Sequence, residues 1–392
     1  MPGFDEDAYL GPASTHRPSL EEFAWLLGRA PRPDDFSLQA ARSTGEATDD
    51  STLVERVMVS YVGAAAEFTP SRSFWDSHFF ELNRSVHDSL VSGDTAKAVA
   101  VLRNPADNTH FWGFDAIAKA PEGQVEPHEL VIRRLNSKVE WTALYALWIM
   151  DSLKNLAEAV GAKRVAYPEV DVAVDSVEQR QNIEETLISI EKSIGVRLVF
   201  PNPYSGEWGL RTTRGILGFR SVQAVYQAWR IRELAGGQSD FKVIEIGAGL
   251  GRTAYFANLL GIKNYTIIDI PLTNAAQAYF LGRTVGERML QLHGETNDGR
   301  LRVLPPNSRA LTEEYDLVVN VDSLTEMDNE VALGYWNFIK HHTPTLLSIN
   351  HEFNSLTVRS LYQKESGLRT MRYPYWMRRG YVEELVQFIG AQ

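Results

Sequence analysis

The stretch Phe241-Lys242-Val243-Ile244-Glu245-Ile246-Gly247-Ala248-Gly249-Leu250-Gly251 decides the fold class of this chain of 392 residues. It begins as a β-branched run, and a helical pattern follows it over Arg252–Leu260. Glycines between a strand and a helix allow the backbone to approach a ligand closely, although a tight turn in any α/β protein can look the same. The stretch therefore predicts a strand, a turn and a helix, with a candidate ligand site at the turn.

Further strand and helix patterns alternate after this turn. The predicted strands are Tyr265–Ile268, Leu301–Leu304, Leu317–Val321, Leu346–Ile349 and Tyr381–Phe388, and a long helix is expected over Leu272–Leu292. Alternating strands and helices imply a parallel sheet with right-handed crossovers. The second half of the chain is thus predicted to be an α/β domain.

The first half of the chain is predicted to be mainly helical. Helices are expected at Ser19–Leu27, Ser51–Phe68, Arg84–Leu102 with a break at 92–94, Val139–Val160, Ser176–Ile194 and Ser221–Leu234. A short strand is possible at Val196–Phe200, and the composition of 201–206 indicates a loop. The predicted organisation is a partly flexible extension (1–50), a helical domain (51–200) and a ligand-binding domain (201–392), in which 201–237 connects the two.

The composition excludes several classes of protein. The formal net charge is −11, whereas a general nucleic-acid binder usually carries a basic face. The chain has no cysteine, which rules out disulfides and thiolate metal sites. Its start lacks a secretory pattern, and the apolar run Trp141–Met150 is about half the length that crosses a bilayer. We expect a cytoplasmic protein that binds neither membranes nor nucleic acid.

Two ligands suit the glycine-rich turn, NAD and S-adenosylmethionine. The spacing G-x-G-x-G departs from the dinucleotide pattern, which wants its third glycine later. Glu245, taken to lie inside the turn, suits a cationic ammonium better than a pyrophosphate. Asp269 comes twenty-two residues after Gly247 and could bind both ribose hydroxyls, or could simply cap a helix. Together these residues favour the adenosyl sulfonium.

The predicted cofactor site extends beyond the turn itself. A loop after the third strand carries an amide that could meet the edge of an adenine. The predicted cofactor contacts are Glu245, Gly247, Ala248, Gly249, Gly251, Asp269, Ile270, Asn307 and Asp322.

Several segments of the second half resemble known enzymes. Glu245–Gly249, Thr266–Pro271 and Tyr315–Asn320 together resemble the class I S-adenosylmethionine-dependent methyltransferases. A wider set of segments is similar to a bacterial family of sugar O-methyltransferases: Tyr226–Arg230, Ser348–Asn354 and Arg372–Tyr381. The resemblance runs from about Asn202 to the last residue.

This resemblance implies a Rossmann-like, mostly parallel sheet with helices on both faces, preceded here by the helical domain. It also implies a reversed hairpin edge, S-adenosylmethionine as methyl donor, and a hydroxyl of a sugar or a glycosylated natural product as acceptor. Only about forty residues follow Ile349, so the hairpin edge must be compact, with Tyr381–Phe388 as its last strand.

Methylation of a hydroxyl requires help with its proton, because an alcohol has a high pKa. A base within hydrogen-bond reach or a metal ion can give that help. After the fourth and fifth strands, His351 is the preferred base and Asp322 the second candidate. A third possibility is Mg²⁺ held by Asp322, Glu326 and Glu352, since hard oxygen ligands suit that ion. Glu352 and Asn354 are also predicted to contact the acceptor.

Two aromatic and basic clusters are further candidates for the acceptor site. Tyr204, Arg214 and Arg220 precede the sheet, and Trp376 lies near the end of the chain. Aromatic rings stack on sugars and arginines bind hydroxyls or phosphates, but packing, salt bridges or a homodimer contact would use the same residues. Two other functions stay open: methylation of a phenol or carboxylate, and a non-catalytic scaffold that kept the fold.

Overall fold

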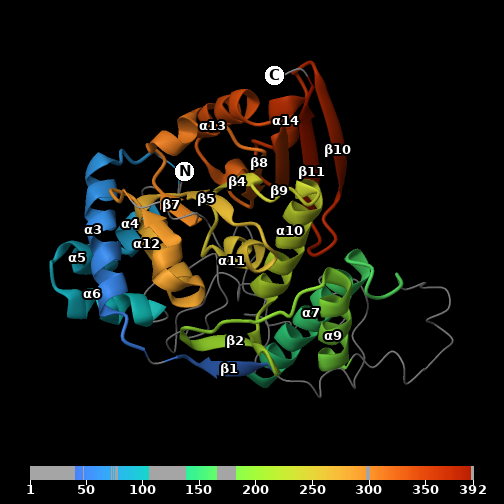
Figure 1. Cartoon of the computed structure of the whole chain (residues 1–392), viewed down its shortest axis with the longest axis horizontal. Helices are drawn as coiled ribbons and strands as arrows, with labels where there is room; N and C mark the ends of the chain where they lie inside the picture. Colours follow the sequence, from blue (N-terminus) through green and yellow to red (C-terminus); the bar gives the residue numbers. More distant parts are fainter. Residues whose placement is uncertain are drawn as a thin grey trace, which may run out of the picture. The chain divides into compact units, whose positions relative to one another are not determined.

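The computed structural model describes residues 40–46, 48–71, 73, 75, 78–105, 138–165, 182–296 and 301–389. Nearly all of the predicted extension, including the helix expected at Ser19–Leu27, lies outside these residues. The described chain forms two compact units, each assembled from separate segments (Figure 1). The first unit contains 40–46, 138–165, 182–229 and 376–379, and the sheet unit contains 48–105, 230–375 and 380–389.

The first unit combines helices with a small antiparallel sheet. Its elements are α7 (Lys138–Ala159), α9 (Ile183–Ile194), the start of α10 (Phe219–Ala235) and the strands β1 (Ala41–Thr44), β2 (Ser205–Thr212) and β3 (Gly215–Leu217). The sheet order is β1-β2-β3. Helix α9 begins at Asn182, whose side chain accepts two backbone N–H bonds, and it ends at left-handed Gly195.

The small sheet was not predicted, and the strand expected at Val196–Phe200 does not form. The residues 205–206, which we assigned to a loop, begin β2 instead. Two glycines, Gly206 and Gly209, obscure the alternation of apolar and polar side chains in β2. Gly209 is required because β3 approaches it closely: a Cβ there would lie 2.4 Å from the Leu217 carbonyl oxygen. Loop-like composition can therefore hide a strand that packs tightly on its neighbour.

The sheet unit is built on eight strands in the order β10-β11-β9-β8-β4-β5-β7-β6. The strands are β4 (Lys242–Ile246), β5 (Asn264–Ile268), β6 (Leu290–Leu292), β7 (Leu301–Leu304), β8 (Leu317–Val321), β9 (Thr345–His351), β10 (Leu368–Pro374) and β11 (Tyr381–Phe388). Strands β6, β7, β5, β4, β8 and β9 pair in parallel, and β11 runs antiparallel to both β9 and β10. This confirms the predicted hairpin edge, and the sheet has the arrangement expected of the α/β class I fold.

Helices between the strands cover the sheet and bury its apolar side chains. They are α11 (Arg252–Leu259), α12 (Pro271–Leu281), α13 (Asn329–His342) and α14 (Val358–Tyr362), together with the end of α10. On one face Ile244, Ile246 and Val318 pack against Trp336 and Ile339 of α13. This core fixes where β4 and β8 end, and so where the residues after those strands lie.

The helix expected over Leu272–Leu292 is shorter than predicted. Helix α12 ends at Leu281, a π-helical turn and a 3₁₀ turn follow, and the last three residues form the edge strand β6. Gly286, with a left-handed φ of 105°, ends the π-helical turn and so stops the helical path before β6.

Helices α3 (Ser51–Glu67), α4 (Phe79–Leu82), α5 (Arg84–Val91) and α6 (Thr95–Arg103) belong to the sheet unit, whereas we expected them in a helical domain over 51–200. The carboxylate of Asp50, just before α3, is buried and accepts hydrogen bonds from Arg103, Tyr279 and Arg283. Leu53 packs where Gly282 leaves no side chain. These contacts attach the α3–α6 segment to α12 and so to the sheet.

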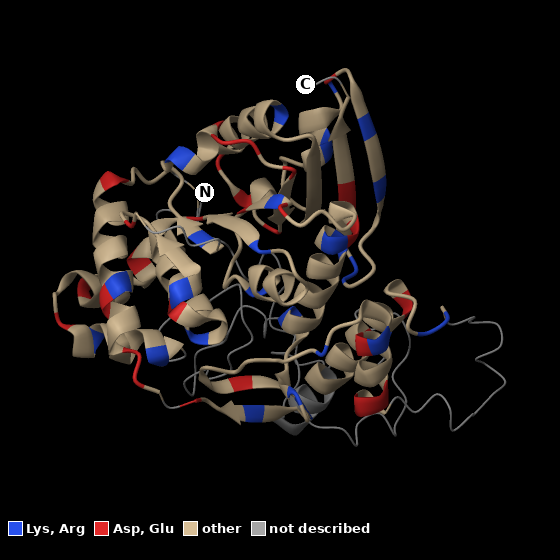
Figure 2. Ribbon diagram, in the orientation of Figure 1, with Lys and Arg blue, Asp and Glu red and all other residues tan. Residues whose placement is uncertain are grey.

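Charged side chains of both signs are interspersed along the helices of the sheet unit (Figure 2). Ion pairs such as Arg56–Glu295, at 2.8 Å, link neighbouring elements. Within the part of the chain that the structure describes, no helix is both long enough and apolar enough to cross a membrane.

Candidate functional site

The glycine-rich turn follows β4 and has the conformation that only glycine adopts easily. Gly247, Gly249 and Gly251 have φ values of 72°, 56° and 86°, all in the left-handed region. The N–H of Gly247 donates to the Ile268 carbonyl of β5, at 2.9 Å. A Cβ on Gly247 would lie 2.2 Å from the Ser323 hydroxyl oxygen, which leaves no room for one. The backbone of the turn therefore packs closely against the end of β5 and against Ser323, which follows β8.

The sequence suggested that Glu245 lies inside the turn. In the structure it lies within β4 instead. Its neighbours Ile244 and Ile246 point into the core on one face of the sheet, so the Glu245 side chain points to the other face. There it is 1% exposed and accepts a 2.8 Å hydrogen bond from the Tyr265 hydroxyl. Burial raises the pKa of Glu245 to about 8, and a cationic group bound beside it would lower that pKa again.

Asp269 follows β5 and is fixed by two donors. One carboxylate oxygen accepts the N–H of Ile270, at 2.9 Å, and the other accepts the amide of Gln277 in α12, at 2.7 Å. The same Gln277 amide nitrogen donates to the Gly249 carbonyl, at 2.8 Å. Gln277 is fully buried and was not predicted, although a glutamine in the apolar sequence of α12 is a usable signal. Gln277 therefore connects the glycine-rich turn to Asp269.

Asn307, predicted to meet an adenine, is exposed and follows β7. Its amide donates to the side chain of Glu67 at the end of α3, at 3.2 Å. The sequence did not indicate this partner. Adenine recognition by Asn307 stays a prediction.

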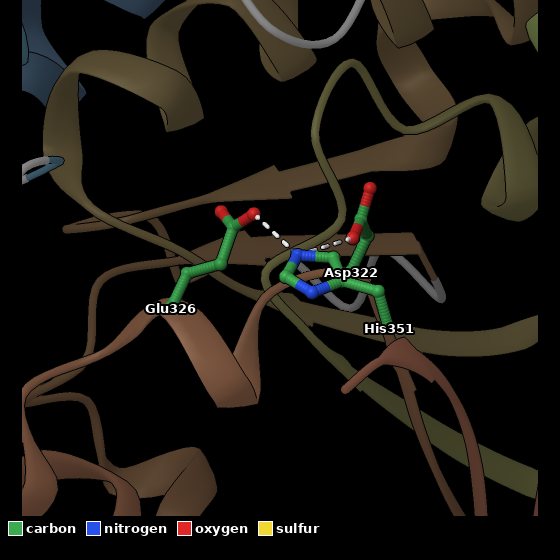
Figure 3. Close-up of side chains that lie close together, drawn as sticks. All are labelled: Asp322, Glu326 and His351. Atoms are coloured by element: carbon green, nitrogen blue, oxygen red, sulfur yellow. Dashed lines mark hydrogen bonds and ion pairs between the residues drawn. The ribbon is translucent and has the colours of Figure 1, made fainter. Parts of the chain in front are cut away.

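Three predicted residues converge at the ends of β8 and β9. The His351 Nε2 atom lies 3.4 Å from Glu326 Oε1 and 3.6 Å from Asp322 Oδ1, so the imidazole stands between two carboxylates (Figure 3). One atom of each residue lies within 4.8 Å of the others, and all three side chains are partly buried. We call Asp322, Glu326 and His351 the acceptor cluster.

Two aromatic residues that the sequence analysis missed hold the carboxylates of the acceptor cluster. The Tyr381 hydroxyl donates to Asp322 Oδ2, at 2.9 Å, and the Trp75 indole donates to Glu326 Oε2, at 2.7 Å. Tyr381 is directly opposite His351 in the β11–β9 register, which the antiparallel hairpin alone determines. Pairing of this kind cannot be read from a single sequence.

Asp322 has the one left-handed backbone among the described residues other than glycine, with φ 56°. Its N–H donates to the Ile349 carbonyl of β9, at 2.9 Å, which holds the backbone in this conformation. Strained backbone of this kind occurs most often at functional sites.

Buried amides connect the acceptor cluster with the glycine-rich turn. The Asn320 amide donates to the Ile246 carbonyl of β4, at 2.9 Å, and its oxygen accepts from the Asn350 amide of β9, also at 2.9 Å. The Ser323 hydroxyl donates to the same Ile246 carbonyl, at 2.9 Å. The ends of β4, β8 and β9 are therefore held together by hydrogen bonds of one network.

The acceptor cluster does not fit the predicted magnesium site of Asp322, Glu326 and Glu352. Glu352 is exposed and pairs with Arg372 at 2.6 Å, so His351 takes its place in the group. Mg²⁺ demands oxygen ligands in near-octahedral geometry, and an imidazole suits other metals better.

The hydrogen bond at His351 Nδ1 is also incompatible with a metal ion of any kind bound at Nε2. The Phe353 N–H donates to His351 Nδ1, at 3.3 Å, so Nδ1 must carry a lone pair and the neutral ring holds its proton on Nε2. A metal at Nε2 would need the reverse arrangement.

The remaining predicted acceptor contacts have other partners. Asn354 donates to the Thr325 carbonyl, at 2.9 Å. In the first unit Tyr204 is fully buried, and Arg214, with a side chain 7% exposed, binds Glu184 and Glu191. Hydrogen bonds from Arg214 lower the pKa of Glu191.

Tyr204 and Arg214 thus have the packing and ion-pair roles that were the alternative to substrate binding. Arg220 lies partly buried in the first turn of α10, and Trp376 is 46% exposed in the turn between β10 and β11. For these two, a role in binding the acceptor stays a prediction.

Comparison with known proteins finds no family model and no curated protein that matches the chain. Part of the chain is similar to several solved structures. They include the magnesium protoporphyrin IX methyltransferase from Synechocystis PCC 6803 with bound S-adenosylmethionine (14% identity, 43% of this chain, 81% of that one, TM-score 0.32). An rRNA methylase from Streptococcus thermophilus (11%, 41%, 95%, 0.32) and a glycopeptide N-methyltransferase complexed with S-adenosylmethionine (17%, 42%, 87%, 0.30) are also similar.

Identities and TM-scores this low assign no activity to the chain. The class follows from the sheet itself: six parallel strands, a glycine-rich turn after β4 and a reversed hairpin edge. The sheet unit is an α/β protein with the class I methyltransferase fold.

Proposed function

We propose that this chain transfers a methyl group from S-adenosylmethionine to a hydroxyl of a sugar or of a glycosylated small molecule. One observation carries the proposal. The glycine-rich turn and the acceptor cluster lie at the same edge of one sheet, connected through Ser323 and the buried amides. Brought together in this way, a nucleotide-binding turn and a group of proton acceptors suit transfer from a bound cofactor to a polar acceptor.

The residues around the turn suit the cofactor chemically. Gly247 and Gly249 expose backbone, Asp269 offers a carboxylate to ribose hydroxyls, and buried Glu245 favours a cation over a pyrophosphate. S-adenosylmethionine, when bound, supplies an electrophilic methyl group on a sulfonium. The chain's own residues hold and orient it.

The acceptor cluster suits a hydroxyl acceptor. Two carboxylates and an imidazole at 3.4–3.6 Å offer hydrogen bonds to an acceptor O–H and a place for its proton. Aligning this oxygen with the methyl carbon supplies much of the rate in a displacement of this kind. The rings of Trp75 and Tyr381 adjoin the carboxylates, and aromatic rings beside carboxylates are a common surface for a sugar.

A methyl-transfer assay with labelled donor tests the proposal. The purified chain is incubated with S-adenosylmethionine labelled in its methyl group and with nucleotide sugars, aryl glycosides, phenols and carboxylic acids in parallel. We expect the label on the glycosides or nucleotide sugars. Label on phenols or carboxylic acids alone would replace the sugar with another acceptor. Binding of S-adenosylhomocysteine without transfer to any acceptor would favour the scaffold.

Two matched variants accompany the assay. Asp322→Asn removes the carboxylate after β8 and should lower transfer by at least about 100-fold. Glu314→Gln removes an exposed carboxylate before the same strand and should leave transfer unchanged. Equal activity of the two variants would contradict a role for the acceptor cluster.

A further inference from the structure

The two ring nitrogens of His351 have partners of opposite kinds. A backbone N–H can only donate, so the bond from Phe353 to Nδ1, at 3.3 Å, requires a lone pair on Nδ1. In the neutral ring the proton then sits on Nε2. Nε2 in turn is hydrogen-bonded to Glu326 Oε1, at 3.4 Å, and lies 3.6 Å from Asp322 Oδ1. His351 is thus arranged as a hydrogen-bond donor to Glu326, with the Asp322 carboxylate as a second, longer contact.

A donor of this kind is poorly placed to act as a base. To take a proton at Nε2, His351 would have to lose the proton that it shares with the carboxylates and gain one on Nδ1. A proton on Nδ1 would then face the Phe353 N–H. The carboxylates have no such conflict, because an ionised carboxylate only accepts.

Of the two carboxylates, Asp322 is the one whose neighbour in the chain contacts the glycine-rich turn. Its neighbour Ser323 is the residue that a Cβ on Gly247 would meet, and Ser323 is bonded to the end of β4. One Asp322 oxygen is held by the Tyr381 hydroxyl, so the other is directed toward His351. Glu326 belongs to the following 3₁₀ turn and is held by Trp75.

From this geometry we infer that Asp322 is the catalytic base and that His351 is a positioning residue, whose Nε2–H binds Glu326 and adjoins the Asp322 carboxylate. The inference rests on the proposed function. As the acceptor oxygen bonds to the methyl carbon, its O–H bond breaks and the proton passes to Asp322 Oδ1. The carbon–sulfur bond breaks, and its electron pair stays on sulfur as a neutral thioether. The proton later leaves Asp322 for water.

The tautomer of His351 can be measured without any acceptor. The chain is labelled with ¹⁵N-histidine, and long-range ¹⁵N–¹H spectra are recorded at pH 7.5 in EDTA, with and without S-adenosylhomocysteine. The His351→Gln variant identifies the signal among nine histidines. We expect the proton on Nε2 in both states. A proton on Nδ1, or a ring protonated on both nitrogens, would overturn the assignment whatever the protein methylates.

Kinetics with an acceptor identified by the transfer assay separate the two roles. Glutamine at 351 keeps an amide donor but cannot act as a base, so His351→Gln should keep kcat within about tenfold and keep the pH profile of kcat. Asp322→Asn should lose at least about 100-fold in kcat. The inference fails if His351→Gln loses as much as Asp322→Asn, or if its pH profile changes. The absence of transfer with every acceptor would count against the proposed function, while the tautomer would still report on His351.

Discussion

The nucleotide half of the site and its acceptor half are assembled in different ways. The nucleotide half comprises Glu245, the turn 247–251, Asp269 and Gln277, all within thirty-three residues of chain. The acceptor half is the acceptor cluster with Trp75 and Tyr381, which lie about three hundred residues apart. Local sequence therefore encodes the first half, whereas the second half exists only because the sheet brings distant segments to one edge.

The carboxylates of both halves are held by short hydrogen bonds, but the imidazole of the acceptor half is held less closely. Asp269 receives bonds of 2.9 and 2.7 Å from Ile270 and Gln277, both close in sequence. The contacts of His351 with Asp322 and Glu326 are longer, at 3.6 and 3.4 Å. Asp322 and Glu326 receive bonds of 2.9 Å from Tyr381 and 2.7 Å from Trp75. We conclude that the carboxylates of both halves are preformed, whereas the contacts of His351 have room to shorten around an acceptor.

The largest expected effect comes from Gly247→Ala. Its φ of 72° and a Cβ only 2.2 Å from the Ser323 hydroxyl oxygen mean that either the glycine-rich turn or Ser323 must move. We expect the affinity for S-adenosylhomocysteine to fall at least about 100-fold in calorimetry, because backbone contacts in a preformed site tolerate little displacement. Gly93→Ala is the control: its φ is 74°, and no atom lies within 4 Å of the added Cβ. If both variants bind normally, the turn is not the binding site.

The second expected effect concerns Arg214, which belongs to neither half of the site. Arg214→Ala leaves Glu191 and Glu184 without their partner, and the Arg214 side chain is 7% exposed. Breaking a largely buried ion pair should lower the free energy of unfolding by about 3 kcal/mol. Arg211→Ala, an exposed position on β2, should cost less than about 0.5 kcal/mol. Denaturant unfolding measures both, and affinity for S-adenosylhomocysteine in the folded variants should stay within twofold.

An unchanged free energy of unfolding in Arg214→Ala would contradict the structural role of Arg214.

The pH dependence of cofactor binding tests Glu245. Its pKa of about 8 in the free chain means that the carboxyl must lose its proton to pair with an ammonium group. Affinity for S-adenosylhomocysteine should therefore rise up to about tenfold per pH unit below pH 8 and level off above it. Titrations in buffers of different ionisation enthalpy should show release of up to one proton. Glu245→Gln should remove both effects, and the same slope in that variant would exclude Glu245 as the partner.

The same raised pKa affects stability with a definite sign. The folded chain keeps the Glu245 proton up to about pH 8, whereas the unfolded chain loses it near the ordinary glutamate pKa of 4.5. The contribution of Glu245 to stability is therefore present below about pH 4.5 and is lost as the pH rises through 8. Thermal unfolding of wild type and Glu245→Gln over this range measures the difference.

The smallest expected effect is that of Tyr381→Phe. The substitution removes the 2.9 Å bond to Asp322 and keeps the ring, which contacts His351 edge-on at 5.6 Å between centroids. A hydrogen bond in a partly buried setting should be worth about 1 kcal/mol in thermal unfolding. Affinity for S-adenosylhomocysteine should stay within twofold, because the tyrosine belongs to the acceptor half. A tenfold loss of affinity would mean that the two halves are not separate.

Most of the sheet could be predicted from the sequence, because its central strands are short β-branched runs with clear turns. The strands Leu301–Leu304, Leu317–Val321 and Tyr381–Phe388 have their predicted bounds. Strand β2 and the small sheet of the first unit could not, since glycines interrupt their pattern. The attachment of α3–α6 to α12 depends on buried Asp50, whose partners lie up to 233 residues away.

The candidate site was predictable to the extent that it follows strand ends. Asp269, Asp322 and His351 come directly after or at the ends of strands, where parallel sheets place their ligands. The exact partners were not predictable. Glu352 pairs with Arg372, and His351 joins Asp322 and Glu326, because one residue along an extended chain reverses the direction of a side chain.

The central claim is that the glycine-rich turn binds an adenosyl sulfonium, and a calorimetric titration tests it most directly. S-adenosylhomocysteine and NAD are titrated into the same preparation of wild type and of Gly247→Ala. The account predicts saturable binding of one S-adenosylhomocysteine per chain, little or no binding of NAD, and loss of binding in the variant. Tighter binding of NAD, or unchanged binding of S-adenosylhomocysteine by Gly247→Ala, would contradict it.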